Sequence, residues 1–272
     1  MTSLADGNWR LIREESRPGP MQMALDEVAA ETAATGGPRT VRVYRWEPST
    51  LSLGYQQDAS TVDWSYCERE GITVTRRQTG GGGIYHDREG DLSYSIVAPA
   101  AELPGSLLES YELLCQPILA ALDQMGVDAA FADAKQPAIY QPACYLRGIH
   151  PAHDVLANGR KVSGNAQYRQ RDAVVQHGSL SYTLAVNHHL GVFQTTGVTN
   201  AQFRDRVTAI REESNTTRSR AVEILEDSLR TWADTQADDW TEAELARARE
   251  IADAKYRAEE WNRSRVDPLP SE

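Results

Sequence analysis

The sequence predicts an α+β domain with a mixed, mostly antiparallel sheet flanked by helices. Segments that alternate like β-strands are interspersed with helical segments, but the regular strand–helix–strand order of parallel α/β folds is missing. The strongest short-range signal is Asn158-Gly159 between two alternating segments. This dipeptide favours the tight turn that joins antiparallel strands.

The first half of the sequence predicts one helix and five strands. Residues 20–35 form an amphipathic helix with Pro20 in its first turn, and one face carries Met21, Leu25, Val28 and Ala29. The expected strands are 41–46, 50–54, 72–77, a short one that begins at 84, and 92–98. We expect the last two to form a hairpin around the turn 87–90.

The second half begins with a long helix and ends in helices. Residues 106–126 fit a helix kinked at Pro117, and its inward side chains would be Leu107, Leu108, Tyr111, Leu114, Ile118, Leu122 and Met125. Residues 132–152 resemble a loop, the Asn158-Gly159 hairpin follows, and 173–184 form a further strand. The pattern is helical after about 200, where Thr241 and Glu244 have the spacing of a capping box.

Composition limits the classes of protein that fit. We expect one domain over 1–263, with its core at about 9–200, a helical segment at about 200–263 and a frayed tail at 264–272. The net charge of −11 argues against a nucleic-acid partner. No apolar run reaches 18 residues and the N-terminus lacks a signal-peptide pattern, so the sequence predicts a cytoplasmic protein without a membrane partner.

The segment Arg76–Asp87 is the first candidate for chemistry. Gly80, Gly81, Gly82 and Gly83 follow a strand, and glycines there allow backbone amides to approach an anionic or carbonyl oxygen. Arg76 and Arg77 precede them and can bind a phosphate or carboxylate. A flexible hairpin loop is the alternative. The segment matches neither the phosphate-loop nor the dinucleotide-binding pattern.

Lys161 is the second candidate. The chain has only three lysines against 25 arginines. In such a chain an exposed lysine without a functional role is less expected. Its ammonium can polarise an acyl carbonyl, and Ser163 and Gly164 offer small residues beside which a ligand chain can pass. His177-Gly178 and His86 lie in predicted strands, where a structural hydrogen-bonding role is the more ordinary interpretation.

Taken together, several motifs resemble the lipoate–protein ligase and octanoyltransferase family. They are MALDE (23–27), RVYRWEPSTLSLGYQQ (42–57), RRQTGGGGIYHDREGDLSYS (76–95), GRKVSGNAQYR (159–169) and QHGSL (176–180), and they occur in the family's order. The resemblance implies a fold shared with biotin ligases. It also implies that Lys161 is the family's essential lysine. An acyl or ATP site would include Arg76, Arg77, Gly80 to Gly83, Ile84, His86, Ser163, Gly164, His177 and Gly178.

The family contains two chemistries, and the sequence favours the ligase slightly. A ligase uses ATP and Mg²⁺ to convert lipoate to lipoyl-AMP, then transfers the lipoyl group to a lysine of a carrier domain. His153-Asp154-Val155 resembles the ligases' Asn-Asp-hydrophobic element, so Asp154 is a candidate metal ligand, although His153 departs from that pattern. Asp154 as a structural hairpin residue is equally compatible.

The alternative is an octanoyltransferase, which takes octanoyl from an acyl carrier protein. Cys144 lies in a loop 17 residues before Lys161. This position resembles the place where cysteine-dependent transferases carry their nucleophile, so the thiol of Cys144 would be the nucleophile. A buried structural cysteine is the other interpretation. A third and less favoured function is an acyl- or adenylate-binding protein without turnover.

The resemblance also implies partners. The acceptor would be a lipoyl carrier domain, of the 2-oxoacid dehydrogenase E2 type or the glycine cleavage H protein. A separate accessory domain protein is a further expected partner, because some ligases of this family depend on one.

Overall fold

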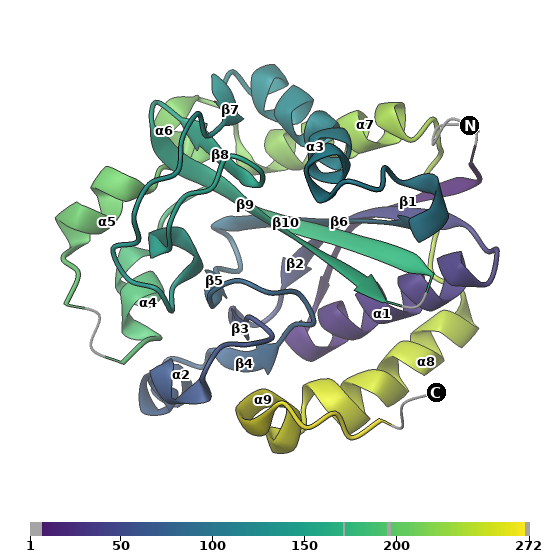
Figure 1. Cartoon of the computed structure of the whole chain (residues 1–272), viewed down its shortest axis with the longest axis horizontal. Helices are drawn as coiled ribbons and strands as arrows, with labels where there is room; N and C mark the ends of the chain where they lie inside the picture. Colours follow the sequence, from purple (N-terminus) through teal and green to yellow (C-terminus); the bar gives the residue numbers. More distant parts are fainter. Residues whose placement is uncertain (1–6, 171, 195–196, 270–272) are drawn as a thin grey trace.

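The computed structural model describes residues 7–170, 172–194 and 197–269, and it contains two sheets (Figure 1). The larger sheet has the strand order β1-β2-β6-β10-β9-β8-β7, and the smaller has the order β4-β3-β5. The strands are β1 (Trp9–Arg17), β2 (Arg39–Trp46), β3 (Thr50–Leu53), β4 (Thr73–Arg76), β5 (Ile84–His86), β6 (Asp91–Pro99), β7 (Ala129–Phe131), β8 (Asp154–Ala157), β9 (Arg160–Gln170) and β10 (Ala173–Ser181).

Helices cover both faces of the larger sheet (Figure 1). The α-helices are α1 (Gly19–Ala34), α2 (Trp64–Arg69), α3 (Leu107–Gln124), α4 (Val186–Gly191), α5 (Asn200–Arg206), α6 (Ile210–Glu213), α7 (Arg218–Trp232), α8 (Glu242–Ile251) and α9 (Glu259–Ser264). A π-helical turn, Ala252–Tyr256, continues α8. Short 3-10 turns lie at Ala59–Thr61, Ala100–Glu102 and Cys144–Leu146.

Alternation along the strands gives the larger sheet two cores. Val41, Ile96 and Leu180 point toward α3 and α7. Tyr44 and Val97 point to the other face, where they pack with α1 and α8. Because successive side chains of a strand alternate between faces, both surfaces of the central strands are buried. Among the named strands of the larger sheet only β1 and β2 pair in parallel, and in the smaller sheet β3 pairs in parallel with β4, so the predicted mixed, mostly antiparallel α+β fold is confirmed.

One predicted pairing is wrong. The strand from Ile84 and the strand 92–98 were expected to form a hairpin, but β5 pairs with β3 and β6 pairs with β2 and β10. The turn at 87–90 does form, and the side chain of Asp87 accepts hydrogen bonds from the amides of Glu89 and Gly90. The turn therefore passes the chain from one sheet to the other rather than folding it back on itself.

Two local predictions are confirmed and one is corrected. Asn158 and Gly159 have φ angles of 49° and 75° between β8 and β9, as a tight hairpin turn requires. Thr241 and Glu244 form both hydrogen bonds of a capping box. Leu107 and Leu108 were expected to face inward, but they are 58% and 50% exposed because they occupy the first turn of α3, where it projects beyond the core.

No helix in the described part of the chain has the length and apolar character needed to cross a membrane.

Candidate active site

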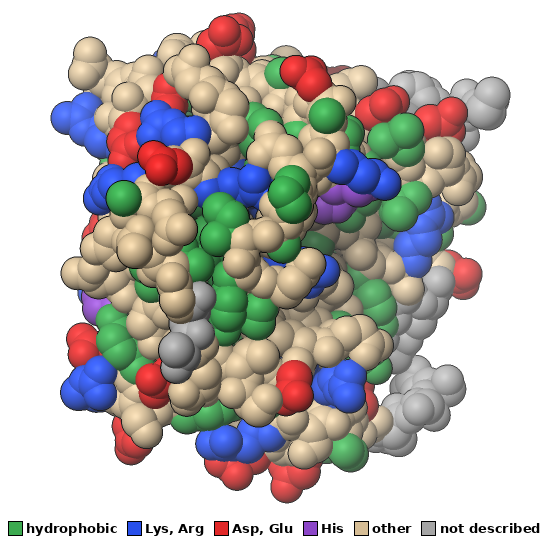
Figure 2. Space-filling model, turned by 60° about the vertical axis from the view of Figure 1, so that its left-hand side comes forward, with side chains coloured by type: hydrophobic (Ala, Val, Ile, Leu, Met, Phe, Trp, Pro, Cys, Tyr) green, Lys and Arg blue, Asp and Glu red, His purple; other side chains and the backbone are tan. Residues whose placement is uncertain are grey.

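A cavity of about 350 Å³ lies where the smaller sheet meets the larger one. Its walls come from α1, from β2, β3 and β5, from the glycine loop, and from the central strands β9 and β10. The loop before β8 closes the remaining side. Figure 2 shows a hollow on this face, bordered by hydrophobic and Lys or Arg side chains, with the acidic side chains mostly toward the edges.

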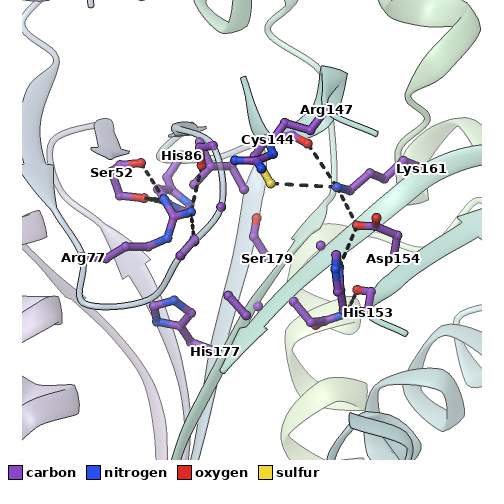
Figure 3. Close-up of a pocket in the computed structure, with 18 of the residues that line it drawn as sticks. Ser52, Arg77, His86, Cys144, Arg147, His153, Asp154, Lys161, His177 and Ser179 are labelled. Atoms are coloured by element: carbon purple, nitrogen blue, oxygen red, sulfur yellow. Dashed lines mark hydrogen bonds and ion pairs between the residues drawn. The ribbon is translucent and has the colours of Figure 1, made fainter. Parts of the chain in front are cut away.

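Cys144, Lys161 and Asp154 meet in this cavity (Figure 3). The ammonium of Lys161 lies 2.7 Å from Asp154 Oδ1 and 3.9 Å from Cys144 Sγ. It also donates a hydrogen bond of 3.1 Å to the backbone oxygen of Cys144. The second oxygen of Asp154 accepts a hydrogen bond of 2.7 Å from the amide of His150. A cation is therefore fixed beside the only cysteine that lines the cavity among the described residues.

The charges of this group support one another. Burial alone would lower the pKa of Lys161, but Cys144 and Asp154 raise it above its usual value. Burial alone would raise the pKa of Asp154, but the Lys161 ammonium beside it holds that pKa well below its usual range. The raised pKa favours the ammonium form of Lys161 at neutral pH, and an ammonium can stabilise negative charge beside it.

Backbone hydrogen bonds hold Cys144 against the glycine loop. The amide of Gly83 donates to the oxygen of Pro142 over 2.7 Å, and the amide of Cys144 donates to the oxygen of Gly83 over 2.7 Å. A Cβ at Gly82 would lie 2.7 Å from the Pro142 oxygen and 2.9 Å from the Cys144 nitrogen. Gly82 is thus needed for the close approach of two backbones, a role that the sequence analysis did not assign to it.

Arg77 shapes the glycine loop from inside. Its guanidinium donates to the oxygens of Gly80 and Gly82, each over 2.8 Å, and to the backbone oxygen of Ser52 over 2.8 Å. It also donates to Thr79 Oγ1 over 3.0 Å. These bonds consume the donors of Arg77, so its main effect is to fix the loop that borders the cavity.

Two histidines of the cavity are held by carboxylates. His177 Nδ1 lies 3.2 Å from Asp26, and its Nε2 lies 2.6 Å from Thr79 Oγ1. His86 Nδ1 lies 2.6 Å from Asp91, and its ring stacks on Trp46 with 4.0 Å between centroids. Burial lowers the pKa of His86, although Asp91 opposes this. Both rings have the fixed partners that are typical of positioning residues.

The structure brings most of the predicted site residues to the cavity. The ones that line it are Arg77, Gly80, Gly81, Gly82, Ile84, His86, Cys144, Asp154, Lys161, Gly164, His177 and Gly178. Arg76, Gly83 and Ser163 are absent from this lining. Arg76 instead donates to the oxygens of Trp261 and Asn262, which ties the C-terminal segment to β4. Ser163 pairs with Leu180, whose side chain lies in the core under α3, so it faces away from the cavity.

Other lining residues were not predicted from the sequence. Met23, Tyr44 and Trp46 give the cavity apolar walls, and Arg147 and Ser179 add polar groups. The strand alternation that includes His177 also includes Ser179, so the sequence carried a signal for that residue. Met23 begins the MALDE motif, but Arg147 had no such signal, because only the fold brings the loop before β8 to the cavity.

A comparison with protein families decides the classification. Residues 18–230 match the model of the lipoyl protein ligase A/B catalytic domain. The chain belongs to this family. The match includes the glycine loop, Cys144, Asp154 and Lys161, and the family and the relatives below are lipoate ligase or octanoyltransferase enzymes.

Three curated relatives of this family member carry the name octanoyltransferase LipM. The protein of Kyrpidia tusciae is 33% identical over 93% of this chain and 98% of its own length. That of Geobacillus kaustophilus is 30% identical over 93% of this chain and 97% of its own length. That of Staphylococcus aureus is 29% identical over the same shares. These relatives favour the octanoyltransferase alternative over the ligase function that the sequence analysis preferred.

Solved structures share the fold. A lipoate-protein ligase A bound with ATP superimposes with a TM-score of 0.79 at 24% identity, and covers 95% of this chain and 100% of its own. A putative lipoate protein ligase from Thermoplasma acidophilum with bound lipoic acid gives a TM-score of 0.77 at 25% identity, with shares of 94% and 98%. The family's fold is therefore common to ligases and to this chain, and the choice between the two reactions rests on other observations.

Proposed function

We propose that this protein is an octanoyltransferase that moves octanoyl from an acyl carrier protein to a lysine of a lipoyl carrier domain through a thioester on Cys144. The observation that carries the proposal is the position of Cys144 Sγ on the cavity wall, 3.9 Å from the Lys161 ammonium. The names of the relatives point to the same reaction.

In the first half of the reaction the sulfur of Cys144 attacks the carbonyl carbon of the octanoyl thioester. A new C–S bond forms to Cys144 and the C–S bond to the carrier breaks. The carrier leaves as a thiol with the proton that Cys144 gives up. Lys161 stabilises the negative charge on the attacking sulfur, because its charge is held within 3.9 Å by Asp154 and the Cys144 backbone oxygen.

In the second half the amine of the acceptor lysine attacks the octanoyl-Cys144 thioester. An amide C–N bond forms, the C–S bond to Cys144 breaks, and the proton lost by the amine restores the thiol of Cys144. The octanoyl group arrives already activated as a thioester, so the reaction as written consumes no ATP.

The apolar part of the cavity suits the octanoyl chain. Met23, Tyr44, Trp46 and Ile84 line it, whereas the charged residues gather around Cys144. An acyl group on Cys144 would thus direct its carbonyl to the charged end and its alkyl chain to the apolar walls.

Magnesium does not suit the donors of this cavity. Asp154 is the only carboxylate among the described residues that line it. One of its oxygens is paired with Lys161 and the other accepts from His150, while Mg²⁺ prefers oxygen ligands free to complete an octahedron. In the proposed mechanism Asp154 therefore serves as the ion-pair partner of Lys161 and not as a metal ligand.

The test is mass spectrometry of a lipoyl carrier domain incubated with the purified protein. One reaction contains octanoyl-acyl carrier protein without ATP, and the other contains lipoate, ATP and Mg²⁺. We expect octanoylation in the first reaction and an octanoyl adduct on the Cys144 peptide. The proposal fails if only the ATP-dependent reaction gives product, because that result identifies a ligase.

Three variants sharpen this test. Cys144→Ala should abolish the adduct and the transfer, and Lys161→Ala should abolish transfer while the protein stays folded. Cys67→Ala is the matched control, since Cys67 is 2% exposed and lies outside the cavity. If Cys144→Ala transfers octanoyl at the wild-type rate, the nucleophile is misassigned. If neither reaction gives product but the acyl group binds, the protein is a non-catalytic binder or needs an accessory partner.

A further inference from the structure

Arg147 is a cation of the cavity that the mechanism above does not use. Three described residues that line the cavity carry a positive charge: Arg77, Arg147 and Lys161. Arg77 donates to loop oxygens, and Lys161 is paired with Asp154. Within the described residues, the guanidinium of Arg147 alone of these three has no hydrogen-bond or ion-pair partner. Its five donors are therefore available to a ligand.

Hydrogen bonds on both sides anchor the backbone of Arg147. Its amide donates to the oxygen of Ala143 over 2.9 Å, and its own oxygen accepts from the Arg206 guanidinium over 2.9 Å. Arg206 is 9% exposed and also donates to Gln136 and Pro137. A guanidinium on an anchored backbone loses less conformational entropy when it binds a ligand.

The same backbone brings Arg147 close to Cys144. A Cβ built on Gly82 would lie 2.8 Å from Cδ of Arg147 and 2.9 Å from the Cys144 nitrogen. Figure 3 shows the end of Arg147 near Cys144, while Lys161 approaches Cys144 from β9. Burial lowers the pKa of Arg77 to about 10, and the charge of Arg147 adds to this lowering, which places Arg147 within electrostatic range of the loop.

We propose that Arg147 is a second catalytic cation, which binds the acyl carbonyl oxygen while that oxygen carries negative charge in the intermediates formed on Cys144. This inference rests on the octanoyltransferase function proposed above. When sulfur or amine attacks, the π electrons of the carbonyl move to the oxygen. They return when the C–S bond breaks. Arg147 forms no covalent bond and transfers no proton.

The charges around Lys161 explain why a second cation is needed to stabilise the acyl oxygen. Lys161 and Asp154 form a pair with no net charge, and the ammonium already donates to Asp154 and to the Cys144 oxygen. Arg147 is the cation of the cavity with unused donors, and a preorganised donor directed at a developing oxyanion is among the strongest catalytic effects.

The test compares the rate of acylation of Cys144 for the wild type, Arg147→Gln and Arg147→Lys. Two donors are used: octanoyl-acyl carrier protein and the small, uncharged octanoyl thioester of N-acetylcysteamine. The amount of octanoyl-Cys144 in samples quenched during a single turnover, measured by mass spectrometry of the intact protein, reports the rate. We expect Arg147→Gln to lower the rate constant about 100-fold with both donors, and Arg147→Lys to restore part of the loss.

Each other outcome has a defined meaning. A loss confined to the protein donor would show that Arg147 docks the carrier, and wild-type rates in both variants would show that it has no role; either result overturns the proposal. Arg249→Gln is the control, since Arg249 is exposed on α8, away from the cavity. Absence of any octanoyl-Cys144 in the wild type would instead refute the proposed function, so the two failures are distinguishable.

Discussion

Lys161 and Asp154 form a buried ion pair with 2.7 Å between Nζ and Oδ1, and their side chains are only 4% and 2% exposed. Such a pair contributes little to stability when intact, but removing one partner leaves the other charge buried and uncompensated. The pair therefore keeps a cation beside Cys144 that the protein interior would otherwise reject, and this leads to the first prediction.

Asp154→Asn should destabilise the protein at pH 7 by about 3–5 kcal/mol and abolish acylation of Cys144, since the Lys161 ammonium loses its partner. The pKa of Asp154 is lowered in the folded protein, so the stability from its carboxylate is present above the unfolded value near 3.8 and is lost as the pH falls below it. Urea denaturation of wild type and variant at pH 7 and pH 3.5 measures both effects.

A matched control for this variant is Asp128→Asn, because Asp128 is exposed. It should change the free energy of unfolding by less than about 0.5 kcal/mol at either pH. An Asp154→Asn variant as stable as the wild type at pH 7 would contradict the buried-pair account.

Gly164 should tolerate no side chain, because it lies directly against Lys161 and Cys144. A Cβ there would be 3.1 Å from Cε and 3.2 Å from Nζ of Lys161, and 3.4 Å from Cys144 Sγ. Gly164→Ala should displace Lys161 and lower the acylation rate about 10- to 100-fold, since small misplacements of reacting groups are costly. Single-turnover acylation, with circular dichroism to verify folding, checks this.

The comparison variant for Gly164 is Gly105→Ala, which meets no atom within 4 Å at its Cβ and has no positive φ. It should acylate Cys144 at the wild-type rate. Equal rates for Gly164→Ala and Gly105→Ala would mean that Lys161 can move without loss, and that its 3.9 Å distance to Cys144 Sγ is not critical.

Arg76 is predicted to hold the C-terminal segment and not the substrate. Its guanidinium is fully buried and donates to the backbone oxygens of Asn262, Trp261, Gly54 and Gln57. Arg76→Met should leave several buried carbonyl oxygens without donors, at about 1–3 kcal/mol for each such group. We expect limited proteolysis to cut the variant within 252–269 faster than the wild type.

If Arg76→Met resists the protease like the wild type but loses affinity for the acyl donor, Arg76 belongs to the substrate site after all. Arg265→Met provides the comparison, because Arg265 is exposed and its guanidinium donates to the side chain of Gln56 at the surface. That variant should change proteolysis little.

Much of the fold was predictable because the informative signals are local. The Asn158-Gly159 turn and the Thr241–Glu244 capping box each depend on a few neighbouring residues, and both occur as predicted. The hairpin expected around the turn 87–90 failed because alternation identifies a strand but not its partner. Here β5 joins β3, a pairing decided by tertiary packing.

In the candidate site, too, local signals were predictable from the sequence and tertiary contacts were not. The motifs identified Cys144, Lys161 and Asp154 because residue type and family order both pointed to them. No pattern showed that Cys144, which lies 17 residues before Lys161 in sequence, has its sulfur 3.9 Å from the Lys161 ammonium. Arg76 and Arg77 are adjacent, and alternation along a strand sends their side chains in different directions. The sequence alone had no means to decide which of the two faces the cavity.

His189 should make the protein less stable in mild acid. It is buried against the rings of Tyr85, Tyr145 and Phe203, and burial lowers its pKa to about 4, with nearby carboxylates opposing. Because the folded pKa lies below the unfolded value near 6.5, the unfolded chain binds more protons between these values. Stability is complete above about pH 6.5 and falls as the pH drops toward 4, by about 2 kcal/mol at pH 5. His189→Phe, which keeps the ring contacts, should remove this loss, as urea denaturation at pH 7.5 and pH 5 will show. An equal loss in the variant would assign the acid sensitivity to other groups.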